Sequence, residues 1–158
     1  CDTVCMANIA QMVNVLQAMI LTEGSKMVLT PTYHVFALYA AHQGAQQLES
    51  YAETSILRHD EEAVPTLHVS ASRAADGKIL VTVANLDAAH PAEAQVLLGG
   101  VKAAAVDGTV LCGTADARNT FTVPDAVQPR ALSAVLTADG FTVTLPACSV
   151  AAFTVTPQ

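Results

Sequence analysis

The sequence of 158 residues contains no tryptophan, and aromatic residues make up only 4% of it. A core of normal packing density must therefore be filled by aliphatic side chains, and hydrophobic residues account for 52% of the chain. Charged residues are also scarce, at 13% compared with about 25% in an average soluble domain. This scarcity suggests that further protein covers part of the surface.

Basic residues are few, since 7 Lys and Arg stand against 14 Asp and Glu and the formal net charge is −7. Because phosphate binding needs clustered cations, this balance argues against a nucleic acid or an anionic membrane as partner. The longest apolar run, residues 12–22, is interrupted by Asn14 and Gln17 and is too short to cross a bilayer. We therefore expect no nucleic-acid partner and no membrane partner.

The cysteines lack both the CxxC spacing of zinc sites and the density of a disulfide-rich secreted domain. They are Cys1, Cys5, Cys112 and Cys148. Apolar neighbours surround the last three, so we interpret the cysteines as buried free thiols in a reducing compartment, and we expect a cytoplasmic protein.

The histidines are dispersed over different predicted elements, at positions 34, 42, 59, 68 and 90. His34 and His42 lie eight residues apart on one predicted helix, where no Cys or carboxylate completes a metal-binding set. We interpret them as residues of the helix surface. Neither a metal site nor a cofactor is predicted.

The stretch from Val4 to Val15, with the sequence VCMANIAQMVNV, is apolar and uncharged but contains amide side chains. Residues 4–10 form a nearly continuous apolar run, which is typical of a strand covered on both faces in a parallel sheet. The rest of the chain supplies no partner units for such a sheet, and position 1 is Cys instead of Met. We therefore expect residues 4–10 to be the last strand of a larger α/β body.

A helix is predicted to begin at Pro31, because Thr30 is a good N-cap residue and proline is favoured at the first helical position. Gly44 follows the last turn, where helices commonly end on a left-handed residue. Apolar residues lie almost all round this helix, so we expect it to be shielded on more than one side. Residues 12–29 before it are predicted to be a connection with an exposed turn at residues 23–26.

From Val64 onward, apolar and polar residues alternate with a period of two, which is typical of half-buried strands. The alternating apolar positions are Leu67, Val69 and Ala71; Ile79, Val81 and Val83; Ala94, Val96 and Leu98; Leu132, Ala134 and Leu136; Phe141, Val143 and Leu145; Ala151, Phe153 and Val155. Asp-Gly pairs, a strong hairpin signal, occur at residues 76–77, 107–108 and 139–140. Short strands at this spacing predict an antiparallel β-sandwich.

The fold class is therefore mainly β, with a jelly-roll-like antiparallel sandwich preceded by a strand, loop and helix. We predict that residues 1–45 belong to the α/β body, that residues 46–63, which are rich in Gln and acidic residues, form a linker, and that residues 64–158 form the sandwich.

No catalytic residue is predicted in this chain. Hydrolysis of a glycoside usually needs two carboxyl groups about 5 to 10 Å apart. Glu61 and Glu62 are adjacent in the predicted linker, where solvation explains them, and Asp125 lies in a predicted turn.

Gln11 is the predicted binding residue, because it follows the strand at residues 4–10. In a parallel α/β barrel the active site lies at the carboxyl ends of the strands, and an amide can both donate to and accept from a sugar hydroxyl. The alternative is a glutamine that satisfies the backbone of its own loop. Asn8 and Asn14 are weaker candidates by the same reasoning.

Two segments, MANIAQMVNVLQAMILTEG and MVLTPTYHVFALYAAHQGA, resemble the last strand, loop and helix of the catalytic (β/α)8 barrel in the α-L-arabinofuranosidases of glycoside hydrolase family 51. Three later segments, VTVANLD, NTFTVPDAVQP and VTLPACSVAAFTV, resemble the C-terminal sandwich of that family. The resemblance covers nearly the whole chain.

The resemblance implies a retaining exo-hydrolase that removes terminal arabinofuranose from arabinan, arabinoxylan or their oligosaccharides. The family's two catalytic glutamates lie on earlier barrel strands, upstream of Cys1, so the chain itself is expected to be inactive and structural. The sugar-contacting glutamine of the family falls on Gln11. The family sandwich also borrows a strand from the protein's N-terminus, so an unpaired sheet edge is expected here.

A homo-oligomer of the parent enzyme is expected as well. The alternative function is a non-catalytic carbohydrate-binding β-sandwich module. Such modules commonly stack sugar rings on exposed aromatic residues, whereas this chain has no Trp and, beyond the predicted helix, only Tyr51 as a tyrosine.

Overall fold

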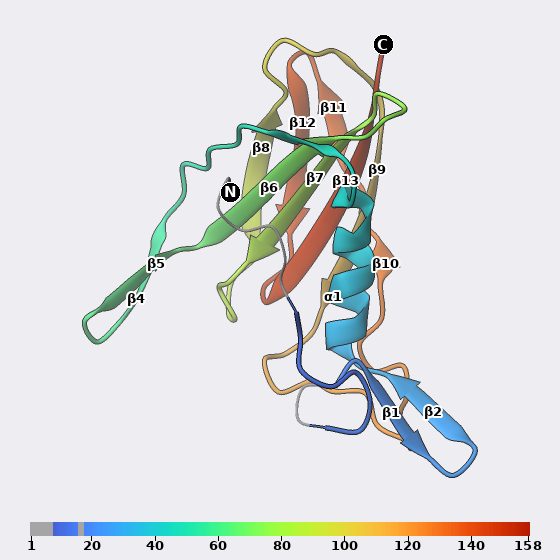
Figure 1. The fold of residues 1–158 in the computed structure, drawn as a ribbon. Helices are drawn as coiled ribbons and strands as arrows, with labels where there is room; N and C mark the ends of the chain where they lie inside the picture. The colour runs from blue at the N-terminus through green and yellow to red at the C-terminus, as the bar shows by residue number, and fades with distance from the viewer. Residues whose placement is uncertain (1–7, 16–17) are drawn as a thin grey trace.

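The computed structural model describes residues 8–15 and 18–158 and consists of two packed antiparallel sheets, with one helix on the outer face of the larger sheet (Figure 1). The antiparallel β-sandwich expected from the period-two pattern is confirmed. Helix α1 (Pro31–Tyr39) lies against β9 and β13 of the larger sheet and continues into the 3₁₀ turn η1 (Ala40–His42).

The larger sheet has six strands in the order β10-β9-β13-β7-β6-β3. Their bounds are β3 (Gln46–Leu48), β6 (Leu67–Arg73), β7 (Ile79–Asn85), β9 (Ala103–Cys112), β10 (Arg130–Ala131) and β13 (Ser149–Pro157). The C-terminal strand β13 lies at the centre, paired with both β7 and β9. Strand β7 is buried along almost its whole length. One face contributes Ile79, Val81 and Val83 to the core, and on the other face Thr82 contacts His42 at the end of η1.

The smaller sheet has three strands in the order β11-β12-β8, with bounds β8 (Ala92–Leu97), β11 (Val135–Thr137) and β12 (Gly140–Leu145). Within the described part of the chain, β8 and β11 each pair only with β12, so both edges of this sheet are open there.

The core between the sheets is aliphatic apart from a pair of phenylalanines. Alternate residues of β7, β12 and β13 point inward, so that Phe141, Leu145, Phe153 and Val155 are at most 1% exposed. The rings of Phe141 on β12 and Phe153 on β13 lie 5.0 Å apart between centroids, and they join the two sheets. The scarcity of aromatic residues thus leaves this pair as the bulkiest contact in the core.

Two further hairpins extend from the sandwich (Figure 1). One consists of β1 (Ile20–Glu23) and β2 (Lys26–Leu29), and its turn confirms the turn predicted at residues 23–26. The other consists of β4 (Ile56–His59) and β5 (Glu62–Pro65), which form a projecting arm. Within residues 46–63, which were predicted to be a linker, β3 pairs with β6 of the larger sheet and is followed by most of the projecting arm.

The prediction for the opening strand falls mostly outside the described residues. Residues 4–7 are not described, and residues 8–10 are not part of a strand. Val13, just beyond them, forms an isolated parallel bridge with Ile20.

The helix begins at Pro31 as predicted, and Gly44 has the expected positive φ of 71°. The side chain of Thr30 does not cap the helix; its hydroxyl instead donates to Ala18 O at 2.7 Å. The prediction that the helix is shielded on more than one side is wrong, since none of its residues is buried and Phe36 is 46% exposed. The helix packs on β9, β13 and β2, and most of its residues are partly buried, whereas Phe36 and Ala37 are exposed.

Two other expectations are corrected by the structure. Asp107 and Gly108 lie inside β9 and not in a turn, whereas the Asp-Gly pairs at residues 76–77 and 139–140 do lie at hairpin turns. Cys112 and Cys148 are free thiols but only half-buried. Cys112 ends β9, where its Sγ accepts a hydrogen bond from Arg130 Nη2 at 3.1 Å. Cys1 and Cys5 lie outside the described residues.

His42 is not a helix-surface residue, since its ring is inserted between the helix end and the larger sheet. Nδ1 lies 2.7 Å from Ser72 Oγ and Nε2 lies 3.2 Å from Thr82 Oγ1, and both hydroxyl-bearing residues are buried. Each hydroxyl can donate or accept, so the pair satisfies a neutral imidazole in either tautomer. Burial lowers the pKa of His42 below its ordinary value of 6.5.

Replacing His42 by alanine is expected to lower the free energy of unfolding by about 1–2 kcal/mol at pH 7.5, because two hydrogen bonds to buried hydroxyls are lost. Since the folded-state pKa is lowered, the unfolded chain binds more protons just below pH 6.5, and the contribution of His42 falls as the pH drops through that range. Urea unfolding of wild type and variant at pH 7.5 and pH 5.5 should show the difference shrinking on acidification. A difference that grows at pH 5.5 would contradict this account.

Candidate functional site

The segment around Gln11 adopts an unusual backbone conformation. Gln11 has φ 51° and Asn14 has φ 57°, and both values lie in the left-handed region that residues other than glycine seldom adopt. Such conformations cost about 1–3 kcal/mol and persist only where the surroundings hold them. The side chain of Gln11 is exposed, as is that of Asn8.

The β1–β2 hairpin holds this segment through Ile20. The backbone N–H of Ile20 donates to Met12 O at 3.1 Å, and the N–H of Asn14 donates to Ile20 O at 3.0 Å. The amide of Asn14 is fully engaged with Thr22, because Nδ2 donates to Thr22 Oγ1 at 2.8 Å and Oδ1 accepts from Thr22 N at 2.6 Å. Asn14 is therefore a support for the loop, whereas the side chain of Gln11 extends from it.

A loop of the sandwich, residues 113–129, reaches the same hairpin through Asn119. Nδ2 of Asn119 donates to Leu29 O at 2.8 Å and to Val127 O at 2.9 Å, while Oδ1 accepts from Val127 N at 2.7 Å. Asn119 is only 4% exposed. Sequence reasoning did not single out this residue, although it begins the NTFTVPDAVQP motif.

Asp125 lies in the same loop and accepts a hydrogen bond from Gln128 Nε2. Burial lowers the pKa of His34 on α1 below its ordinary value, and the negative charge of Asp125 offsets part of this shift. Asp125 thus lies near the start of the helix.

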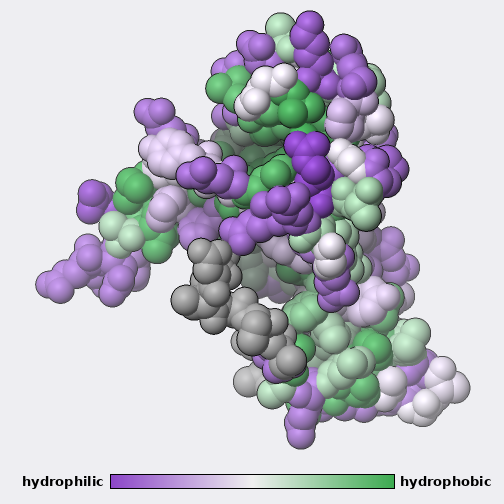
Figure 2. Space-filling view, turned by 45° about the horizontal axis from the view of Figure 1, so that its top comes forward, coloured by the Kyte–Doolittle hydropathy of each residue, from purple (hydrophilic) through white to green (hydrophobic). Residues whose placement is uncertain are grey.

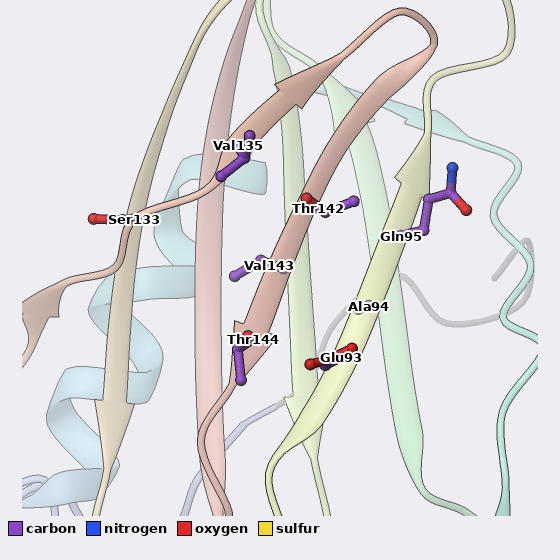
Figure 3. A pocket seen from close by; sticks show the side chains of 8 residues that line it. All are labelled: Glu93, Ala94, Gln95, Ser133, Val135, Thr142, Val143 and Thr144. Atoms are coloured by element: carbon purple, nitrogen blue, oxygen red, sulfur yellow. The ribbon is translucent and has the colours of Figure 1, made fainter.

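A hollow of about 560 Å³ lies over the smaller sheet (Figure 3). Glu93 and Gln95 of β8 lie opposite Thr144 and Thr142 of β12, so the lining carries a carboxylate, an amide and hydroxyls. Glu93 is the one carboxylate among its lining residues, and none of these residues is aromatic. The hollow therefore has neither the paired acids of a glycosidase nor a stacking platform for sugar rings.

A second hollow of about 430 Å³ lies beside it and is lined by Glu53, Asp87, His90 and Glu93, among others. Asp87 is already engaged, because Oδ1 accepts the backbone N–H groups of Ala89 and His90 and Oδ2 lies 3.1 Å from His90 Nδ1. Within residues 8–15 and 18–158 there is no group of three or more His, Cys, Asp or Glu placed to hold a metal ion.

Comparison with known proteins identifies the family. A family model described as the α-L-arabinofuranosidase C-terminal domain matches residues 1–149. The chain belongs to this family. The resemblance predicted from the opening segment, the helix and the sandwich motifs is thereby confirmed.

Relatives of this arabinofuranosidase domain are much longer than the chain. An intracellular exo-α-L-arabinofuranosidase of Bacteroides ovatus is 40% identical over 153 residues, which are 94% of this chain and 30% of that protein. The structure of the family 51 arabinofuranosidase from Xanthomonas axonopodis pv. citri is similar to 98% of this chain with a TM-score of 0.92 and 45% identity, and 32% of that chain is covered. The family 51 α-L-arabinofuranosidase from Bifidobacterium longum is 28% identical with a TM-score of 0.84, covering 98% of this chain and 31% of its own.

No helix within the described part of this arabinofuranosidase domain is long and apolar enough to span a membrane.

Proposed function

We propose that this chain is the C-terminal portion of a retaining, exo-acting α-L-arabinofuranosidase that removes terminal arabinofuranosyl residues from arabinan, arabinoxylan and their oligosaccharides inside the cell. The observation that carries the proposal is the 40% identity to an intracellular exo-α-L-arabinofuranosidase over 94% of this chain. The chain spans about 30% of that relative, and the family resemblance implies that the two catalytic glutamates lie in the remaining part of such an enzyme. The chain itself then acts as a structural, accessory part.

The carboxylates described here support an accessory role. A general acid in a glycosidase needs a raised pKa, which burial or a like charge produces. By contrast, Asp76, Asp87 and Asp116 have lowered pKa values, caused chiefly by hydrogen bonds from the Lys78 side chain, the Ala89 backbone N–H and the Thr114 hydroxyl, respectively. Hydrogen bonds thus favour the charged form of these three carboxyl groups, which is the opposite of what a general acid needs.

Gln11 is the proposed substrate-binding residue of this portion. Its exposed amide extends from a strained loop that is held on the C-terminal side of Gln11 by the hydrogen bonds of Met12 and Asn14. A side-chain amide offers donors and an acceptor to sugar hydroxyls, and a fixed backbone lowers the entropy cost of presenting them. The domain division at residues 45 and 63 remains part of the proposal.

The parent enzyme is proposed to be a homo-oligomer. The projecting arm carries exposed apolar residues, with Ile56 49% and Val64 43% exposed, and the arm shows green surface in Figure 2. Apolar surface at a projecting position is typical of a protein contact.

The full-length protein should hydrolyse 4-nitrophenyl α-L-arabinofuranoside, whereas the 158-residue chain alone should show no turnover. In the full-length protein, Gln11→Ala is expected to lower kcat/KM about 10-fold to 100-fold, because one or two hydrogen bonds to the sugar are lost. The matched control is Gln95→Ala, which removes an exposed glutamine of β8 and should leave kcat/KM unchanged.

Absence of turnover by the full-length protein would refute the proposed activity. Turnover by the isolated chain would refute its accessory role, and an unchanged kcat/KM for Gln11→Ala would refute the binding role alone.

A further inference from the structure

We infer that Asn119 is a positioning residue, which acts from the sandwich to hold the Gln11 loop in its sugar-binding conformation. The inference rests on the proposed function for its catalytic consequence, but its structural part stands on described contacts. On this inference, the sandwich loop at residues 113–129 positions a substrate-binding residue and does not only stabilise the fold.

The contacts form a continuous route from Asn119 to Gln11. Asn119 Nδ2 donates to Leu29 O at the end of β2, a partner 90 residues away in the sequence. Leu29 pairs in register with Ile20 of β1. Ile20 in turn bonds two residues that follow Gln11 in the chain, because its N–H donates to Met12 O and its carbonyl accepts from Asn14 N.

The direction of the Asn119 amide is set within its own loop. The N–H of Val127 donates to Asn119 Oδ1 at 2.7 Å, and the carbonyl of Val127 accepts from Asn119 Nδ2 at 2.9 Å. The amide plane of Asn119 therefore cannot rotate without breaking these bonds. The remaining amide hydrogen then points at Leu29 O. Asn119 therefore places the hairpin relative to the sandwich, and does not merely fill space beside it.

Gln11 depends on this placement because its own conformation is unfavourable. Gln11 has a left-handed backbone and an exposed side chain, so side-chain packing stabilises its conformation little. The hydrogen bonds of the neighbouring backbone must therefore hold this conformation. A displacement of the hairpin by a fraction of an ångström would reach Gln11 through Met12 and Asn14. Misplacement of about 1 Å in a binding group can cost about 100-fold in rate.

The chain offers a matched control in Asn85. Asn85 is 2% exposed and bridges three backbone groups as Asn119 does, donating to His90 O and Pro146 O and accepting from Asp87 N. All of these partners lie within the sandwich. Asn85→Ala should thus destabilise the protein to a similar degree as Asn119→Ala without reaching the Gln11 loop.

The test uses the full-length protein with two readouts. In Asn119→Ala, hydrogen exchange of the Asn14, Ile20 and Thr22 amides should accelerate at least about 10-fold, and kcat/KM for 4-nitrophenyl α-L-arabinofuranoside should fall about 10-fold. Asn85→Ala should change neither. Thr22→Val changes an exposed residue and removes the acceptor for Asn14 Nδ2. This variant should also accelerate the exchange of these amides and lower kcat/KM. It keeps the test decisive if Asn119→Ala does not fold.

A double variant separates positioning from general destabilisation. If Asn119 acts through Gln11, then Gln11→Ala with Asn119→Ala should lose little more kcat/KM than Gln11→Ala alone. Additive losses, or equal exchange in Asn119→Ala and Asn85→Ala, would overturn the inference. A wild-type protein without turnover would refute the proposed function, and the exchange measurement would still decide whether Asn119 holds the Gln11 loop.

Discussion

Replacing Gly140 by alanine is expected to destabilise the protein by about 3 kcal/mol or more, enough to abolish much of its stability. Gly140 begins β12 and pairs with Leu97 of β8. A Cβ atom at this position would lie 1.9 Å from Val96 O and 3.0 Å from Val96 C. Both are backbone atoms of β8, so relief of the clash requires the two strands to separate.

The matched control is Gly77→Ala, at the other Asp-Gly turn. Gly77 has φ 87°, and a Cβ atom there would have nothing within 4 Å, so only the cost of a left-handed alanine remains. That cost is about 1–2 kcal/mol. Urea unfolding of wild type and both variants measures the two losses, and equal losses would show that the close approach of β8 does not decide the effect.

The Asp-Gly pairs show how far a local signal predicts the fold. At residues 76–77 and 139–140 the pair lies at a turn, as predicted, because flanking strands return on themselves there. At residues 107–108 it lies inside β9, where a Cβ atom on Gly108 would come within 2.4 Å of Leu132 O. Glycine allows the positive φ of Gly77, whereas at Gly108 and Gly140 it allows the close approach of another backbone segment, and the dipeptide cannot distinguish these situations.

Strand β9 was missed for a related reason. Strands β6, β7, β8, β12 and β13 alternate clearly and were predicted from that period. The segment AAAVDGTVLC of β9 has small residues where a marked alternation would need large ones. Its place beside β13 is set by pairing along nine positions, which is a long-range property of the sheet.

The candidate site was predictable only where a residue follows a local pattern. Gln11 was singled out by its place after an apolar run, although its left-handed backbone had no sequence signal. Asn119 and His42 depend on partners distant in the sequence, Leu29 for the first and Ser72 and Thr82 for the second. Polar residues at alternate strand positions predict solvent exposure, whereas Ser72 and Thr82 are buried and their hydroxyls contact the His42 ring at the end of η1.

Replacing Phe153 by alanine is expected to cost about 3–5 kcal/mol, which is typical of a buried aromatic residue truncated in a core. Phe153 is 1% exposed and its ring lies 5.0 Å from that of Phe141 on the opposite sheet. With aromatic residues at 4% of the chain, no other large ring lines the described core to take up the space. The surrounding valines and alanines are short, so the cavity should collapse only in part.

The comparison variants are Phe153→Leu and Leu97→Ala. Phe153→Leu keeps most of the volume and should cost clearly less than Phe153→Ala, whereas Leu97, 65% exposed on β8, should change the free energy of unfolding by no more than about 0.5 kcal/mol. Urea midpoints at unchanged m-values measure all three. If Phe153→Ala lost less than about 1 kcal/mol, the Phe141–Phe153 contact would not be what joins the sheets.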